Sequence, residues 1–163
     1  MPLNTVDNDH QKQRILGFLK HHQIGVIATT KSGLQPEAAA VEYGETEDLE
    51  LIIDTFVNSR KWGNIQKNPR VAFVVGWDQD ITVQYEGRVT QLQGEELTKS
   101  KNTYFAKNPR AQKWEGREGV IYFKIVPTWI RYTDTNKNPW EIFGSKSQRT
   151  NFWSNKKTYW FTT

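Results

Sequence analysis

The stretch TFVNSRKWGNIQKNPRVAFVV, residues 55–75, contains the change of pattern on which the fold and the candidate site depend. Strand-like sequence precedes and follows it, whereas residues 59–67 predict one short helix. We expect that helix to stop at Asn-Pro, because a residue before proline avoids the helical region. It begins with Ser59, Arg60 and Lys61. A helix that only fills a core needs apolar spacing, so two cations in its first turn require a separate explanation.

One explanation is an anion site at the start of this helix. The first N–H groups of a helix are free and the positive end of its dipole lies there, which favours a bound phosphate. Arg60 offers a planar bidentate fork and Lys61 a point charge. Ser59, as N-cap or as a ligand, and Thr55, at the end of the preceding strand, add hydroxyl groups. The alternative is an exposed turn whose cations are solvated, at a small cost in stability. Both interpretations remain open on these residues alone.

The rest of the chain alternates between strand-like and helix-like patterns. Helices are expected over residues 7–23 and 95–109, and strands over residues 24–30, 36–44, 49–56, 70–77, 80–94 and 120–134. Gly33 is expected to take a positive φ in the turn after the first strand. We expect the first three strands to form an antiparallel meander. The pattern predicts a mostly β (α+β) domain, with a six-stranded antiparallel sheet closed or nearly closed into a small barrel and short flanking helices.

Length and composition favour one compact domain. The 163 residues suit a single core, and 13% aromatic residues make that core feasible although only 36% of residues are hydrophobic. The chain has no cysteine, which excludes disulfides, thiolate catalysis and Cys-ligated metal sites. No apolar run approaches the ~20 residues of a membrane span, and the N-terminus does not resemble a signal peptide. We therefore expect a cytoplasmic protein, with residues 1–140 as the domain and residues 141–163 as an aromatic tail packed on the barrel or on a partner subunit.

The charge of the chain leaves a nucleic-acid binder open as one alternative. The net charge is +4 and the pI is about 9.2, but the basic residues are scattered and form no run longer than a pair. A small anionic ligand fits this mild basicity equally well. All three histidines lie within the first 22 residues, and two end the first expected helix, where capping is their expected role. No metal site is expected.

Taken in order, several motifs between residues 25 and 132 resemble the pyridoxamine 5′-phosphate oxidase-like, FMN-binding split-barrel family. These motifs are IGVIATT with the following Gly and Pro, LELIIDT, SRKWGNIQKNPRVAFVVGW and ITVQYEGRVTQL. The resemblance implies a six-stranded split barrel, FMN as the cofactor, and a homodimer with two flavin sites at its interface. It also implies a small-molecule substrate. The scattered basic residues disfavour a nucleic-acid partner, and the lack of a long apolar run indicates no membrane partner.

The resemblance further implies which residues bind the cofactor. The set consists of Ala39, Ala40, Val41, Asp54, Thr55, Ser59, Arg60, Lys61 and Thr82. The two cations would hold the FMN phosphate, with the two neighbouring hydroxyl groups close by. Asp54 and Thr55 would close the third strand against the cofactor, and the three residues of the second strand would run along the flavin ring. Thr82 takes the position of a glutamine that contacts the flavin in the oxidase.

Two departures from the oxidase pattern bear on activity. Ala39 stands where the oxidase has a phosphate-binding arginine, and the segment PTWIRYTDTNKNPW, residues 127–140, lacks the Arg-x-His pair that grips the substrate. Oxidation of pyridoxamine phosphate is therefore not expected. The candidate groups on the substrate side are Arg131, Tyr132 and Trp140. The leading hypothesis is an FMN-binding oxidoreductase of unassigned substrate. The alternatives are a flavin-binding or flavin-sensing protein without turnover and a deazaflavin-dependent reductase; catalytic residues are not identified.

Overall fold

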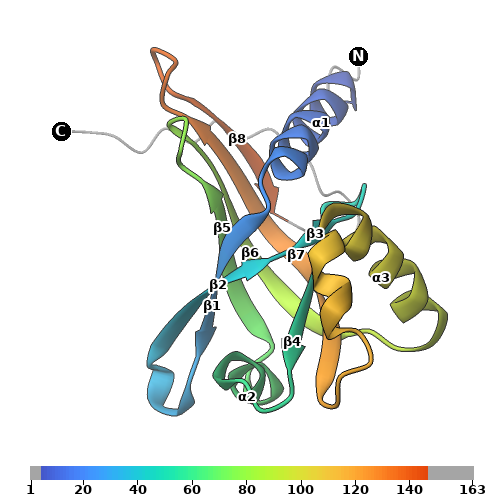
Figure 1. The fold of residues 1–163 in the computed structure, drawn as a ribbon. Coiled ribbons are helices and arrows are strands. Elements are labelled where there is room, and N and C mark those ends of the chain that lie inside the picture. The colour runs from blue at the N-terminus through green and yellow to red at the C-terminus, as the bar shows by residue number, and fades with distance from the viewer. Residues whose placement is uncertain (1–4, 147–163) are drawn as a thin grey trace.

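The computed structural model describes residues 5–146, and over that range the chain forms one curled antiparallel sheet with helices around it (Figure 1). The strands are β1 (Ile24–Thr30), β2 (Pro36–Glu42), β3 (Gly44–Glu45), β4 (Leu51–Phe56), β5 (Arg70–Gly76), β6 (Ile81–Gln91), β7 (Val120–Asp134) and β8 (Glu141–Lys146). The helices are α1 (Thr5–His21), α2 (Arg60–Lys67) and α3 (Gly94–Lys107), with short 3-10 turns at η1 (Ser32–Leu34) and η2 (Pro109–Trp114).

The order of the strands explains why the sheet is a split barrel. Seven of the eight strands follow the order β2-β1-β5-β6-β7-β4-β3, and the eighth, β8, pairs with β7 beside this path. The two ends of the path, β2 and β3, are consecutive in the chain and are separated only by Tyr43. The sheet therefore curls back on itself, which confirms the predicted mostly β split barrel, with eight strands in place of six.

The predicted three-strand meander is wrong in its last step. β1 pairs with β2 as expected, but β4 pairs with β7 along its whole length, from Leu51↔Ile125 to Phe56↔Val120. In the sheet, β4 pairs with the preceding chain only through the two-residue strand β3. Its first three residues are buried in succession, so both faces need cover inside the fold. Periodicity identifies such a strand but not its neighbour, and sequence order gave the wrong one.

The segment after β7 contributes one further strand to the sheet. β8 pairs with β7 from Trp129↔Lys146 to Asp134↔Glu141, so residues 141–146 belong to the sheet. The pattern NKNPWEIFGSK did not reveal this strand, because turn residues precede it and a glycine with a positive φ, Gly144, interrupts it. The remainder of the expected tail, residues 147–163, lies outside the described residues.

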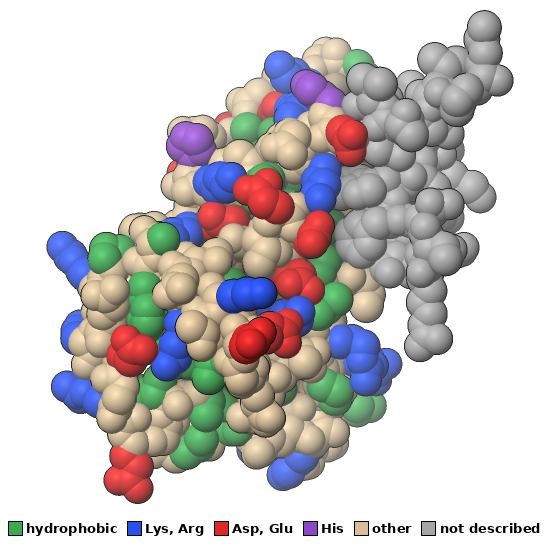
Figure 2. Space-filling view, turned by 90° about the vertical axis from the view of Figure 1, so that its right-hand side faces the viewer, with side chains coloured by type: hydrophobic (Ala, Val, Ile, Leu, Met, Phe, Trp, Pro, Cys, Tyr) green, Lys and Arg blue, Asp and Glu red, His purple; other side chains and the backbone are tan. Residues whose placement is uncertain are grey.

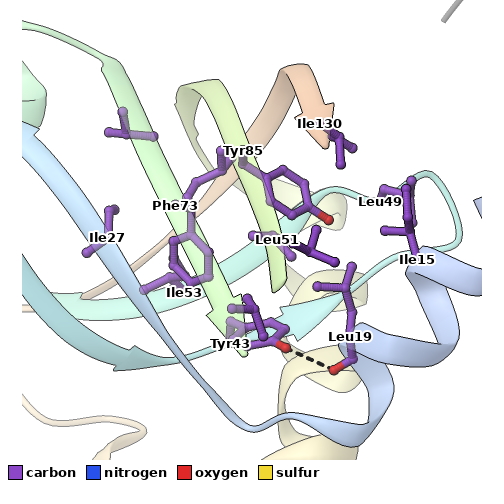
Figure 3. Close-up of a cluster of buried hydrophobic side chains, with 14 of the residues drawn as sticks. Ile15, Leu19, Ile27, Tyr43, Leu49, Leu51, Ile53, Phe73, Tyr85 and Ile130 are labelled. Atoms are coloured by element: carbon purple, nitrogen blue, oxygen red, sulfur yellow. Dashed lines mark hydrogen bonds between the residues drawn. The ribbon is translucent and has the colours of Figure 1, made fainter. Parts of the chain in front are cut away.

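The main core fills the barrel and extends under α1. Ile15 and Leu19 from α1 belong to one buried cluster with Tyr43, which lies between β2 and β3, Phe73 of β5 and Tyr85 of β6 (Figure 3). The Tyr43 hydroxyl donates a 2.9 Å hydrogen bond to the carbonyl oxygen of Leu19, which fixes the end of α1 on the barrel. A second cluster lies under α3 and consists of Ile52, Leu92, Tyr104, Phe105, Ala111 and Tyr122.

The two histidines at the C-terminal end of α1 cap the helix, as expected from the sequence. His21 and His22 each place Nδ1 2.8 Å from the carbonyl oxygen four residues earlier, so both rings cap α1.

On the face shown in Figure 2, Lys and Arg are interspersed with Asp and Glu and no patch of one sign forms. Among residues 5–146, no helix is long and apolar enough to cross a membrane.

Candidate cofactor site

The helix α2 begins as its first residues predict. Ser59 has extended backbone angles and its Oγ accepts a 3.3 Å hydrogen bond from the N–H of Trp62, so it is the N-cap. Trp62 and Ile65 are buried, and the Trp62 ring stacks on Phe123 of β7 at 5.9 Å between centroids. The apolar side of α2 is therefore fixed on the core, and its first turn follows the end of β4 in the chain, with α2 packed near β1 and β2 (Figure 1).

Three polar side chains converge at this point. Thr55 Oγ1, at the end of β4, lies 3.0 Å from Ser59 Oγ, and Lys61 Nζ donates to Thr55 Oγ1 at 3.2 Å. We call Thr55, Ser59, Arg60 and Lys61 the anion turn. The N–H groups of Arg60 and Lys61 have no acceptor within the helix, because they belong to its first turn. Two hydroxyls, an ammonium and free N–H groups are the donors that phosphate oxygens require, so the residues present fit the phosphate end of FMN.

Asp54, the neighbour of Thr55, sets the electrostatics on the Lys61 side. Its carboxylate accepts a 2.9 Å hydrogen bond from the Tyr104 hydroxyl of α3. Burial raises the pKa of Asp54, opposed by the Tyr104 hydrogen bond, its own backbone N–H and the charge of Lys61. Burial lowers the pKa of Lys61, and the charge of Asp54 opposes that effect. Asp54 therefore helps to keep a half-buried lysine protonated.

Glu37 of β2 is the carboxylate partner of Arg60, as Asp54 is the carboxylate near Lys61. Arg60 Nη1 donates to Glu37 Oε1 at 3.2 Å, although the arginine side chain is 81% exposed and the glutamate only 16%. The second carboxylate oxygen of Glu37 accepts a 2.8 Å bond from Asn64 Nδ2. The same amide nitrogen donates to Thr29 Oγ1 at 3.0 Å. The cations of the anion turn thus each have a carboxylate nearby.

The three predicted residues of β2 divide between two faces. Ala39 and Val41 pack against the barrel core, whereas Ala40 points outward. Across the outer surface Ala40 neighbours Val26, which neighbours Val74. We call this strip the outer sheet face; its residues are Val26, Ala28, Ala38, Ala40, Ala72 and Val74. Only Ala40 of the predicted three is therefore directed to a surface on which a ligand or a second chain could lie.

Thr82 is not brought to the anion turn. It is buried, and its Oγ1 donates to the carbonyl oxygen of Val75 at 3.1 Å. Thr82 pairs with Gly76, the last residue of β5. The first residue of β5, Arg70, follows α2 at the opposite end of that strand. Within one chain Thr82 and the anion turn thus lie at different ends of the sheet.

The sequence and the fold of this chain are similar to those of known proteins. The family model described as pyridoxamine 5′-phosphate oxidase matches residues 11–134, which is most of the chain. The chain belongs to the pyridoxamine 5′-phosphate oxidase family. A curated relative, the pyridoxine/pyridoxamine 5′-phosphate oxidase of Ehrlichia chaffeensis, is 32% identical over 89 residues, or 54% of this chain and 43% of that protein. This chain therefore spans less than half the length of that oxidase.

Solved structures with similar folds include several members of this family. A protein from Listeria innocua described as a putative pyridoxamine 5′-phosphate oxidase superposes with a TM-score of 0.63 at 21% identity, over 75% of this chain and 97% of that one. An FMN-binding protein related to the oxidase, from Nostoc punctiforme, gives 0.63 at 13% identity, over 91% and 92%. A heme-binding protein from Mycobacterium smegmatis gives 0.71 at 14% identity, over 85% and 57%. At these identities the likeness shows the shared fold.

In this member of the oxidase family, the three candidate residues on the substrate side differ in burial. Tyr132 is buried, stacks on Phe143 at 4.6 Å between ring centroids, and accepts a hydrogen bond from Arg14. It is therefore a core residue. Arg131 is exposed and donates to Gln84 Oε1 at 2.7 Å, and Trp140 is half exposed. Two surface hollows of about 410 and 450 Å³ include none of the residues of the anion turn.

Sequence reasoning missed Glu37, Asn64 and Tyr104, which surround the anion turn. Glu37 follows a proline at the start of an alternating strand, and alternation alone does not reveal that it faces α2. Asn64 lies one helical turn after Arg60, so helical spacing could have placed both on one side of α2. Tyr104 is 50 residues from Asp54 in sequence, and no local pattern joins them.

The cap at Ser59 gives a first testable prediction. Ser59→Ala removes the acceptor of the Trp62 N–H and the contact with Thr55, so the free energy of unfolding should fall by about 1 kcal/mol. Urea unfolding measures this change. Ser32→Ala is the matched control, because Ser32 is exposed in η1, and it should change stability by no more than about 0.5 kcal/mol. An equal loss in the free energy of unfolding for the two variants would contradict the assignment of Ser59 as the N-cap.

Proposed function

We propose that the protein binds FMN with its phosphate on the anion turn and acts as an FMN-dependent oxidoreductase on a small-molecule substrate. The observation that carries this proposal is the convergence of Thr55, Ser59 and Lys61 at the start of α2. Thr55 Oγ1 lies 3.0 Å from Ser59 Oγ and 3.2 Å from Lys61 Nζ. Membership of the oxidase family supports it, and so does the FMN-binding protein from Nostoc punctiforme among the structural neighbours.

Each part of the proposed site has a separate task. Lys61 and Arg60 offset the phosphate charge, and the hydroxyls of Thr55 and Ser59 fix its orientation by hydrogen bonds. The charge of Asp54 opposes the lowering of the Lys61 pKa by burial. The bound flavin would supply the capacity to accept and donate hydride or electrons, and the protein would position a substrate against it. The absence of a continuous positive patch on the face in Figure 2 gives no support to a nucleic-acid partner.

A homodimer is part of the proposal, because one chain leaves the site open. The outer sheet face is apolar beside β2, with Val26 38% exposed, Val74 36% exposed and Ile24, next to it, 60% exposed. Ala40 opens onto the same face. A two-fold symmetric contact would cover this face on both chains and could bring Thr82 of one chain toward the anion turn of the other.

Light scattering tests the proposed assembly. We expect a mass of about twice the 19.0 kDa of one chain. Val74→Asp places a charge on the outer sheet face and should give a monomer. Leu34→Asp is the control, since Leu34 is 82% exposed at the β1–β2 turn, and it should leave the dimer intact. A monomeric wild-type protein that still binds FMN would contradict the shared site.

Anaerobic reduction tests the oxidoreductase activity. Protein loaded with FMN is mixed with NADH or NADPH, and the loss of flavin absorbance is compared with that of free FMN at equal concentration. A reductase should accelerate this reduction and should then reduce added electron acceptors. If the bound flavin is reduced no faster than free FMN by either donor, a storage or sensing role replaces the enzymatic one. Preferential binding of a deazaflavin over FMN would instead favour a deazaflavin-dependent reductase.

A further inference from the structure

Glu37 is held in a position where it meets any phosphate that approaches Arg60. Both of its carboxylate oxygens are in use: one accepts from Arg60 Nη1 at 3.2 Å and the other from Asn64 Nδ2 at 2.8 Å. Asn64 is itself buried and is fixed by Thr29 of β1. The glutamate is therefore tied to the inner side of α2 and to the barrel, and its carboxylate has little freedom to leave.

Arg60 is the exposed partner of this pair. Its side chain is 81% exposed, whereas that of Glu37 is 16% exposed. The pair uses one nitrogen of the guanidinium, so the remaining N–H groups can turn to a phosphate. When Arg60 binds a phosphate it must either share its charge between two anions or release Glu37. Release would leave the carboxylate with Asn64 alone, in a partly buried place where an unpaired charge is costly.

The formal charge of the turn and its immediate partners supports the same conclusion. Arg60 and Lys61 are balanced by Glu37 and Asp54, so the cluster has no net positive charge before a ligand arrives. Ala39 stands two residues along β2 and supplies no further cation. A fixed carboxylate within a few ångströms of a bound phosphate repels it strongly enough to change affinity, because screening is weak at a partly buried site.

We propose that Glu37 is a specificity-determining residue that competes with phosphate for Arg60 and keeps the affinity for phosphate esters low. FMN is then an exchangeable ligand of this chain rather than a permanently bound group. The proposal rests on the proposed binding of FMN by the anion turn, and it adds a residue that sets the strength and lifetime of that binding.

The test is a comparison of Glu37→Gln with the wild-type protein in equilibrium titrations with FMN and with riboflavin. Gln retains the size of the side chain and an oxygen that accepts from Asn64. We expect Glu37→Gln to bind FMN at least about tenfold more tightly and to release it more slowly, with riboflavin affinity unchanged. Glu37→Asp, which keeps the charge, should stay close to the wild type. Glu47→Gln is the matched control: it removes one negative charge at a surface pair with Lys20 and should change nothing.

The outcomes separate this proposal from the one on which it rests. Weaker FMN binding by Glu37→Gln would show that Glu37 positions Arg60 instead of competing for it, and equal binding would show that it does neither. Both results overturn the proposal while FMN binding stands. If both the wild type and Glu37→Gln bind FMN no better than riboflavin, the anion turn does not hold the phosphate and the proposed function fails. Thermal melting of each variant confirms that it is folded before titration.

Discussion

Replacing Arg60 and Lys61 together by alanine is expected to weaken FMN binding by about two to four orders of magnitude. Each charge-assisted contact to a phosphate contributes ~1.5–3 kcal/mol, and ~1.4 kcal/mol corresponds to tenfold in affinity. The variant also leaves Asp54 and Glu37 beside the phosphate without their cations, which adds repulsion. The helix should persist, because Ser59 still caps it and Trp62 remains buried. Fluorescence titration with FMN measures the change.

Riboflavin, which lacks the phosphate, is the ligand control for this double variant and should bind both proteins almost equally. The matched protein control is the pair Lys113→Ala and Arg117→Ala, which removes the same charge from two cations that pack over Trp114. It should leave FMN binding unchanged. An unaltered FMN affinity in the Arg60 and Lys61 variant, or an equal loss for riboflavin, would contradict the assignment of the anion turn.

FMN-loaded protein is expected to form no meaningful amount of pyridoxal phosphate from pyridoxamine phosphate. The Arg-x-His pair is absent after the last predicted strand, and a site that lacks several polar contacts to a substrate loses ~10⁴-fold or more in discrimination. In the structure the turn after β7 is held against the β5–β6 turn, where the N–H of Thr135 donates to the carbonyl oxygen of Asp80 at 3.0 Å. That turn lies at the end of β7 away from the anion turn, since Val120 at the other end pairs with Phe56.

Oxygen uptake with pyridoxamine phosphate is the measurement, and the same protein reduced by dithionite and reoxidised in air is the control for a redox-competent flavin. Turnover above ~0.1 s⁻¹, against a median enzyme rate of ~10 s⁻¹, would contradict the prediction. It would also extend to this chain the activity named for the Ehrlichia chaffeensis relative, of which it spans 43%. A silent control would show instead that the flavin itself is not functional in the preparation.

Features coded by adjacent residues could be predicted from the sequence. The bounds of β7, the cap at Ser59 and the positive φ of Gly33 at 79° all depend on local patterns, and the structure confirms them. The hydrogen bond from Lys61 to Thr55 joins residues six apart; the motif indicated that both lie near one anion, but it did not predict this direct contact. The amphipathic pattern gave α1 within two residues at either end.

Features that depend on distant segments could not be predicted in this way. The neighbour of β4 is decided by burial on both of its faces, which periodicity does not report. Glu37 reaches Arg60 because the sheet curls, and Tyr104 reaches Asp54 because α3 packs on the sheet. The spacing of these residues in the sequence does not indicate either contact. Thr82 was placed by resemblance alone, and the fold of a single chain separates it from the phosphate site.

A titration of the wild-type protein with FMN and with riboflavin, followed by flavin fluorescence, tests the central claim most directly. The claim is that Thr55, Ser59, Arg60 and Lys61 hold a phosphate, so FMN should bind saturably at one molecule per chain. Riboflavin should bind at least about a hundredfold more weakly, because it lacks the charge-assisted contacts. No saturable binding of FMN, or equal affinity for the two flavins, would contradict the account.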